Sequence, residues 1–529
     1  MRSYLLTNGA LYDGTGAQPA RGDLLIRDGR IAAIGPNLPP PPDARVIDCA
    51  NLCVAPGFID AHSHNDFFPW KGTEYFAPFI RQGITTQVVG NCGFSPFGYE
   101  RDTPYRALIG GGLFSVDGED DYSDLAGFAA AYEKTPVNLA PLVGHGTARI
   151  GLCGYESKPL SPSELTLLTN KVGQCLGEGA LGASLGLMYK PGRYAPFEEL
   201  KAVAQVVKEH GKVLTVHARA CSAVSTSYGL PFGGRPHNIR ALLEAVDLCV
   251  QTGVKLQFSH LIFVGERSFA TVDACMDLID KTRERGFPFM FDMYAGTFGA
   301  SVITVILPAW YLPLRPEQKR SPLVRARLAF EINLSKKLLG FDFSDILIAY
   351  LSPEHQAYEG RTVAQIAREE GAGELETYLR LVELSGGNGH VLMGRYYHQD
   401  IIQRLARHPG ALYMTDAWIE AAGVQNAAAY GTFPRFLALS RDHSIEPLPQ
   451  TIRKMTGATA DRFGLTDRGY LREGAFADLA CFDLENVYGN VEACEDPRGI
   501  VHVFINGAAV LLDGSLTAGL EEKPGRILK

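Results

Sequence analysis

The sequence is poor in the features that mark membrane and secreted proteins. No apolar run approaches the ~20 residues that a membrane-spanning helix needs. The opening MRSYLLTNGALYDG has one arginine and no apolar core, which argues against a secretory signal. The ten cysteines lack the paired short spacings of a disulfide framework or a zinc finger. We therefore expect a protein of the reducing cytoplasm.

Neither charge sign is in large excess. A net charge of -8 and a pI near 5.9 give no reason to expect nucleic acid or an anionic membrane as a partner. Hydrophobic residues make up 46% and charged residues 20%, as in a soluble globular protein. The 529 residues exceed one core of ordinary size, so the length predicts a barrel of ~250 to 400 residues plus a second module.

Short alternating strands occur at both ends of the chain. Residues 1–55 contain the alternating run GDLLIRDGRIAAIG, and Asn-Gly and Asp-Gly hairpin signals occur within this range. Residues 466–529 contain GAFADLACFDLENV and GIVHVFINGAAVLLDG. This alternation of apolar and polar residues differs from the pattern in the middle of the chain. It predicts one small β-sandwich domain assembled from the two termini.

Between the termini, over residues 56–465, short apolar runs alternate with helical patterns such as 196–210 and 238–252. This order is typical of a parallel α/β fold, and eight strands close a (β/α)8 TIM-like barrel. The candidate strands are 52–60, 84–90, 137–144, 180–186, 212–218, 254–260, 287–292 and 411–416.

The segment around 298–410, after the seventh predicted strand, is too long for one loop. It has helical patterns at 323–339 and 362–384, and the runs DILIAYL and HVLMG are possible extra strands. We expect an insertion that overhangs the C-terminal face of the barrel and acts as a lid.

Metal-ligating side chains stand at the ends of several predicted strands, and in a parallel barrel those ends converge on the catalytic face. Taken singly, a histidine at a strand end is usually structural, but the combination predicts a metal site. His62 and His64 lie two apart, so both can face one ion. The candidate ligands are His62, His64, Cys92, His217, His260 and Asp416.

Imidazole and carboxylate with one thiolate favour zinc over magnesium or calcium. Six candidate ligands exceed one tetrahedral site and suggest a tightly bound Zn²⁺ with a possible second, weaker position.

These residues resemble the amidohydrolase superfamily, and within it the D-aminoacylase (N-acyl-D-amino-acid deacylase) group. The resemblance covers nearly the whole chain, in stretches such as VAPGFIDAHSHND, EGALGASLGLMYKPGRYA and YGTFPRF. GNCGFSP is the most specific stretch, because most two-metal amidohydrolases use a carboxylated lysine as the bridging ligand.

The resemblance implies a metal-dependent hydrolase of non-peptide carbon–nitrogen bonds, with a small-molecule amide as substrate. It implies that Cys92, His217 and His260 hold the tight zinc, with His62 and His64 at the weaker site. Asp416 would lie beside them as the general base and acid. It also implies that Tyr189 contacts the substrate, and we expect His145 near the carbonyl.

Two positions depart from the group, and both bear on the substrate. The usual lysine two residues after the strand-six histidine is Ile262 here, and the usual arginine before YGTFPR falls in a run of alanines that includes Ala428. Both cations help to bind the substrate carboxylate in the group. We therefore expect a changed substrate, without a free carboxylate or larger and more apolar, unless Arg219, Arg193 or Arg267 supplies the charge. Trp418 is a further candidate wall of the pocket.

Two other functions stay open. A cyclic amidohydrolase of the hydantoinase or dihydropyrimidinase kind would need a bridging lysine at the end of strand four, but Lys190 lies beyond that strand. A metal-free binding scaffold would be expected to have lost ligands. The sequence does not decide the oligomeric state, and a homo-oligomer is compatible with it.

Overall fold

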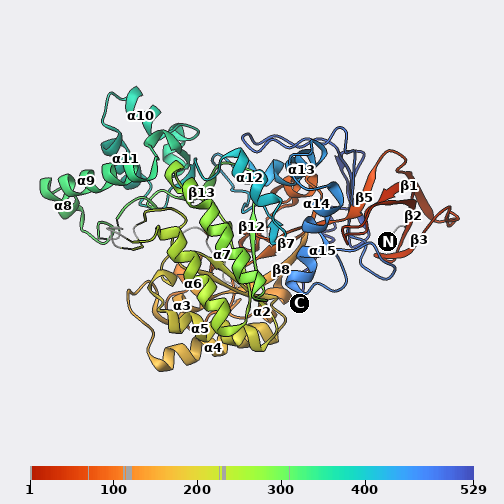
Figure 1. Ribbon diagram of the computed structural model, residues 1–529, viewed down its shortest axis with the longest axis horizontal. Coiled ribbons are helices and arrows are strands. Elements are labelled where there is room, and N and C mark those ends of the chain that lie inside the picture. Colours follow the sequence, from red (N-terminus) through yellow and green to blue (C-terminus); the bar gives the residue numbers. More distant parts are fainter. Residues whose placement is uncertain are drawn as a thin grey trace.

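The computed structural model describes residues 3–69, 71–110, 114, 122–225, 227–228, 234–308 and 310–529. Its strands form an eight-stranded parallel sheet, a nine-stranded mixed sheet and a three-stranded antiparallel sheet. Figure 1 shows the three-stranded sheet with its helices and the strands of the N-terminus at opposite ends of the molecule, with the barrel between them. Within the described residues, no helix is long and apolar enough to cross a membrane.

The eight parallel strands confirm the predicted barrel. They are joined in the order β16-β12-β11-β10-β9-β8-β7-β6. The first and last strands approach each other, since the Ala61 N–H donates to the Tyr413 carbonyl at 3.2 Å and the Asp416 N–H to the His62 carbonyl at 2.9 Å. The strands are β6 (Phe58–Asp60), β7 (Ile84–Val89), β8 (Asn138–Gly144), β9 (Gly182–Gly186), β10 (Val213–His217), β11 (Lys255–Phe258), β12 (Phe289–Met293) and β16 (Ala411–Tyr413).

Helices alternate with these strands, as the sequence predicts. The helix expected at 196–210 is α5 (Phe197–Glu209), and that expected at 238–252 is α6 (His237–Thr252), each with an apolar face turned to the barrel. The other helices outside the insertion are α1 (Ala77–Arg81), α2 (Leu125–Ala131), α3 (His145–Cys153), α4 (Pro162–Gly177), α7 (Val272–Glu284), α12 (Gln399–Ala406), α13 (Ala428–Arg441), α14 (Leu448–Met455) and α15 (Gly457–Phe463).

The first predicted strand, 52–60, is wrong as a single element. It divides into β5 (Cys53–Pro56), which belongs to the nine-stranded sheet, and β6 of the barrel. Gly57 separates them, and a Cβ there would lie 2.3 Å from the Thr85 hydroxyl oxygen, so only glycine fits the crossing. Local hydrophobicity does not reveal which sheet each half joins.

Both termini contribute to the nine-stranded sheet, which confirms the predicted β-module. Its order is β20-β19-β18-β17-β5-β1-β2-β3, with β4 paired to β1. The strands besides β5 are β1 (Ser3–Leu11), β2 (Ala20–Arg27), β3 (Arg30–Gly35), β4 (Ala44–Asp48), β17 (Leu479–Phe482), β18 (Ile500–Ile505), β19 (Ala508–Leu512) and β20 (Ser515–Leu516).

The insertion after β12 contains the two extra strands that the sequence indicates. β15 (His390–Met393) pairs with both β13 (Gly299–Val302) and β14 (Ile346–Tyr350). The helical pattern 362–384 breaks into two helices, and Gly371, in a left-handed conformation at φ +65°, lies between them. The helices here are α8 (Pro316–Lys319), α9 (Pro322–Leu339), α10 (Val363–Glu369) and α11 (Glu374–Leu384).

A buried ion pair joins the terminal sheet to the barrel. Asp478, just before β17, pairs with Arg468, and both side chains are almost fully buried. The Asp478 carboxylate also accepts hydrogen bonds from Asn138 of β8 at 3.1 Å and from the Asn506 backbone at 2.6 Å. One carboxylate therefore holds elements from both parts of the chain.

We predict that Asp478→Ala lowers the free energy of unfolding by about 3 kcal/mol or more, because it removes the buried partner of the buried Arg468 charge. Denaturant titration followed by fluorescence measures the change. Asp467→Ala is the control, since Asp467 also contacts Arg468, at 3.2 Å, but is 47% exposed and its removal should cost little. Equal effects of the two substitutions would contradict the role given to Asp478.

Candidate metal centre

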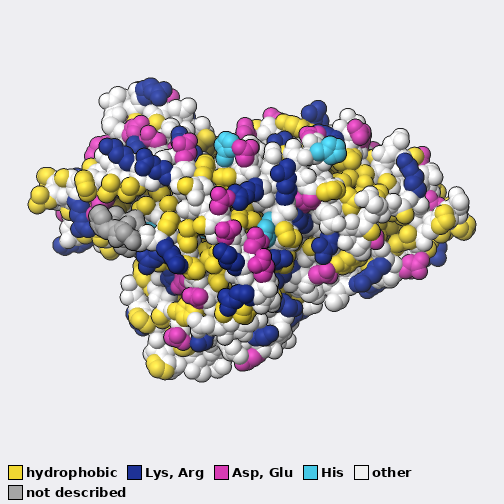
Figure 2. Space-filling view, viewed as in Figure 1, with side chains coloured by type: hydrophobic (Ala, Val, Ile, Leu, Met, Phe, Trp, Pro, Cys, Tyr) yellow, Lys and Arg dark blue, Asp and Glu magenta, His cyan; other side chains and the backbone are white. Residues whose placement is uncertain are grey.

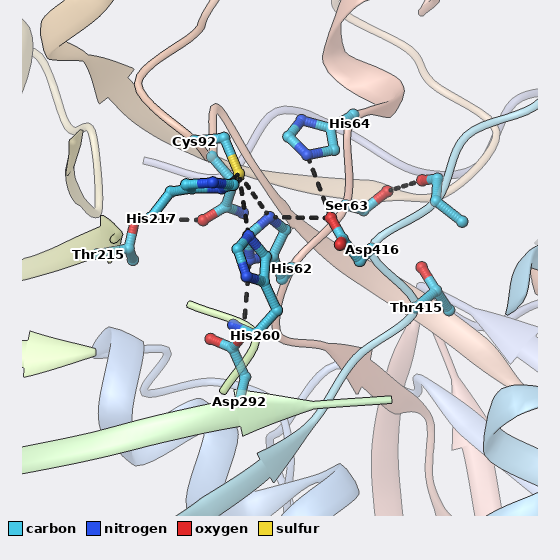
Figure 3. A network of polar contacts seen from close by, with 12 residues as sticks. His62, Ser63, His64, Cys92, Thr215, His217, His260, Asp292, Thr415 and Asp416 are labelled. Carbon is cyan, nitrogen blue, oxygen red and sulfur yellow. Dashed lines mark hydrogen bonds and ion pairs between the residues drawn. The ribbon is translucent and has the colours of Figure 1, made fainter. Parts of the chain in front are cut away.

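The six predicted ligands meet at the C-terminal mouth of the barrel (Figure 3). Each comes from a strand end, and the first strand supplies two of them. His62 and His64 follow β6, Cys92 follows β7 and His217 ends β10. The other two are His260, which follows β11, and Asp416, which follows β16. Parallel strands in a closed barrel bring these distant positions together.

Cys92 lies at the centre of the cluster. Its Sγ is 3.4 Å from His62 Nε2, 3.3 Å from His217 Nδ1 and 3.6 Å from His260 Nε2. In a tetrahedral zinc site with bonds of ~2.3 Å to sulfur and ~2.0 Å to nitrogen, the sulfur and nitrogen ligands stand ~3.5 Å apart. The side chains present therefore fit zinc in both chemistry and spacing.

Asp416 closes the other side of the cluster. Its Oδ1 is 3.3 Å from His62 Nε2 and 3.5 Å from His64 Nε2. One ligand atom from each of His62, Cys92, His260 and Asp416 lies within 4.8 Å of the other three. His217 joins this group through Cys92, and His64 joins it through Asp416, so two adjacent metal positions are sterically possible.

The charges of the cluster stabilise one another. Burial alone would raise the pKa of the Cys92 thiol, but the charges of His62 and His217 bring it well below its usual value. Burial would likewise raise the pKa of Asp416. His62, His260 and His64 instead lower this pKa to about 2. Both groups are thus held in the anionic forms that bind metals.

Three of the candidate ligands have a backbone conformation that residues other than glycine seldom adopt. Cys92, His260 and Asp416 have φ values of +52°, +32° and +51°. The loop after β7 packs so closely on the end of β9 that a Cβ at Gly186 would lie 1.9 Å from the Cys92 carbonyl oxygen. Such strain persists where the surroundings enforce it, and it concentrates at functional sites.

Two buried carboxylates that the sequence analysis missed support these ligands. Asp292, in β12, accepts the His260 N–H at 2.6 Å, and its Oδ1 is 3.6 Å from His62 Nδ1. Asp60, in β6, accepts the backbone N–H groups of His62 at 3.2 Å and Thr415 at 2.9 Å. Both stand at strand ends, which is the one signal that could have singled them out.

The four predicted substrate contacts have different surroundings. Tyr189 lies against the cluster, with its ring centroid 4.6 Å from that of His217. Trp418 packs edge-on against His64 at 5.6 Å between ring centroids. Ile262 lines the cavity next to the cluster. His145 is buried and pairs with Glu199 at 2.8 Å, outside the residues that line this cavity. Its contact with a substrate stays a prediction.

A cavity of about 730 Å³ opens from the cluster toward the insertion. His217, His260 and Asp416 belong to its lining, together with residues of the loops after β9 and β10. The insertion supplies an apolar wall that includes Val302, Val305, Ile306, Leu307, Leu338 and Leu339. The volume is in the range of small-molecule sites, and the ligand cluster occupies one end.

Comparison with known proteins gives a family match over part of the chain. Residues 45–289 match the amidohydrolase family. With the barrel and the ligand cluster, this match makes the chain similar to the hydrolase barrels of the amidohydrolase superfamily.

Within the superfamily the likeness is to D-aminoacylases, over almost the full length. The chain is 29% identical to N-acyl-D-aspartate deacylase of Alcaligenes xylosoxydans xylosoxydans, covering 99% of this chain and 94% of that one. It is 28% identical to D-aminoacylase of the same organism, covering 99% and 97%.

Solved structures give the same grouping. A D-aminoacylase structure described as having a binuclear metal centre superposes with a TM-score of 0.80 at 27% identity, covering all of both chains. N-acyl-D-glutamate deacylase of Bordetella bronchiseptica, complexed with zinc and a phosphonate inhibitor, has a TM-score of 0.79 at 26% identity, covering 100% of this chain and 99% of that one. A hydantoinase of Arthrobacter aurescens, with a TM-score of 0.56 at 15% identity over all of both chains, shares the fold alone.

We predict that Cys92→Ser lowers zinc affinity by at least about tenfold, because a hydroxyl is a much poorer zinc ligand than a thiolate. Metal content after dialysis against a weak chelator, measured by mass spectrometry, tests this. Cys153→Ser is the control, since Cys153 is buried in α3, hydrogen-bonded to the Arg149 carbonyl. Equal zinc in the Cys92→Ser variant and the unmodified protein would remove Cys92 from the site.

Proposed function

We propose that this protein is a zinc-dependent amidohydrolase that cleaves the amide C–N bond of a small acylated amine. The observation that carries the proposal is the buried cluster around Cys92, with three histidine nitrogens at 3.3 to 3.6 Å from one sulfur, at the end of a cavity. The relatives named as deacylases support the reaction class.

Cys92, His217 and His260 would hold the tight metal, with His62 and His64 facing the weaker position. When bound, zinc supplies a Lewis acid that polarises a carbonyl and lowers the pKa of water. His62 Nε2 is 3.4 Å from Cys92 Sγ and His217 Nδ1 is 3.3 Å from it, so His62 can serve as a ligand at either metal position. A chelator should accordingly remove activity, and zinc should restore it.

Asp416 serves as the general base and acid. Its carboxylate borders the cavity and lies against His62 and His64, and its low pKa keeps it ionised at neutral pH. It accepts a proton from the attacking water and then donates it to the leaving nitrogen. The hydrogen bond from the Asp416 N–H to the His62 carbonyl holds its backbone in place.

We predict that Asp416→Asn lowers kcat by about 10²- to 10⁴-fold, the contribution usual for general acid–base catalysis, while most of the zinc stays bound. Steady-state kinetics and metal analysis on the same preparation separate these effects. Full activity of the variant would exclude Asp416 as the base, and loss of all zinc would show that it acts chiefly as a ligand.

The substrate should be larger and more apolar than a simple N-acetyl-D-amino acid. Ile262 stands in the cavity where the group has a lysine, and Ala428 is buried at the start of α13 outside the cavity lining. Neither can bind a carboxylate. The wall from the insertion is mostly aliphatic, so burial of a long apolar acyl group there is favourable.

We expect kcat/KM to rise from acetyl to hexanoyl to decanoyl derivatives of one amine, by up to roughly fourfold for each methylene buried. Val305→Glu should remove this gain by placing a charge in the apolar wall. Leu323→Glu should not, because Leu323 lies on the same insertion but is 83% exposed and outside the cavity. A rate independent of chain length would contradict the acyl site.

The alternatives have less support. A cyclic amidohydrolase would use a bridging lysine, whereas Cys92 occupies the centre of the cluster and Lys190 lines the cavity beyond it. A metal-free scaffold would not explain why the thiol, the imidazoles and the carboxylate converge. The ten free cysteines, nine of them buried, support our proposal of a cytoplasmic location. A homo-oligomer stays a proposal.

A further inference from the structure

Two cations on the loop after β9 lie in the wall of the cavity. Lys190 and Arg193 both line it, and the same loop carries Tyr189, whose ring contacts His217 of the cluster. The Arg193 N–H donates to the Tyr189 carbonyl at 2.8 Å, which closes a tight turn. Both cations are therefore anchored within a few residues of the expected reaction centre.

Neither side chain has an ion-pair or hydrogen-bond partner in the described parts of the chain. The other cations of the cavity wall do. Arg219 contacts Glu244 at 2.8 Å and donates to the carbonyls of Arg193 and Ala195, which removes it as a substitute for the missing lysine or arginine. Lys336 contacts Asp342 at 2.6 Å and Glu374 at 3.3 Å.

Two adjacent cations without an anion are unfavourable in a half-buried place. Burial and the neighbouring charge of Arg193 both lower the pKa of Lys190. Among the described residues of the cavity wall, the carboxylates are Asp416 and Glu331, and Glu331 already pairs with Arg327 at 2.8 Å. The chain as a whole carries a net charge of -8, so this positive locus is a local exception. An anion that contacts both side chains would relieve the repulsion between them.

We propose that Lys190 and Arg193 bind the carboxylate of the substrate, which is then an N-acyl amino acid held from the loop after β9. This assignment rests on the proposed function, because it places the anion relative to an amide at the metal cluster. The arginine fork matches a carboxylate in two hydrogen bonds, and the lysine adds a point charge. The cavity then has a cationic wall beside Tyr189 and an apolar wall from the insertion.

The test compares N-decanoyl amino acids with their neutral carboxamides on the zinc-loaded protein. The unmodified protein should prefer the acid in kcat/KM by roughly ten- to hundredfold, the value of a charge-assisted contact. The double variant Lys190→Met and Arg193→Met should raise KM for the acid by that factor, leave the carboxamide nearly unchanged, and change kcat little.

The control is Lys336→Met, which removes a cation of the same cavity that is already paired. It should keep the preference for the acid. Arg193→Lys in an otherwise unmodified chain should keep part of it, because the charge remains and the fork is lost. Preference for the acid that survives in the double variant, or no preference in the unmodified protein, would overturn the assignment.

A binding measurement separates this proposal from the hydrolysis itself. Calorimetry with zinc-loaded Asp416→Asn protein compares decanoyl acid and carboxamide with and without the two methionine substitutions. A preference for the acid that the substitutions abolish supports the anion site even if no compound in the series is hydrolysed, in which case the hydrolase proposal alone fails. Equal binding of acid and carboxamide refutes the anion site whatever the turnover.

Discussion

The structure depends on the mutual stabilisation of buried charges at the barrel mouth. The Cys92 thiolate is buried and the Asp416 carboxylate is only 21% exposed, so each anion needs positive partners to be stable there. The imidazoles of His62, His217 and His260 lie within hydrogen-bond distance of Cys92 and lower its pKa, and His62, His260 and His64 lower the pKa of Asp416. This arrangement leaves a cluster of donors that suits a soft divalent ion, with the proposed general base next to it.

Buried carboxylates beside the cluster hold the barrel together where it closes. Asp60 binds the N–H groups of His62 and Thr415, so one carboxylate links the first strand to the segment that carries Asp416. Asp292 does the equivalent for His260. These bonds support the left-handed backbone at His260 and Asp416, so the strain of the site is balanced by strand-to-strand contacts.

The barrel and its additions have separate roles. Strand ends provide the candidate ligands and the proposed base, and the superfamily likeness extends over these elements. The insertion and the loop after β9 provide walls of the cavity, and we propose that these walls decide which amide can enter. Figure 2 shows hydrophobic side chains gathered on the surface at the insertion end. Leu323 and Phe330 of α9 are among the exposed ones. Chemistry and substrate choice can therefore change independently.

The sequence by itself determined the barrel, the module made from both termini, the insertion and all six candidate ligands. It could do so because hydrophobic period marks strands and because parallel topology brings strand ends together. Only the tertiary structure divided residues 52–60 between two sheets and found Asp60 and Asp292. It also paired Arg219 with Glu244, while Arg193 has no ion pair among the residues that the structure describes. Those outcomes depend on which distant residues become neighbours, and local sequence carries no record of that.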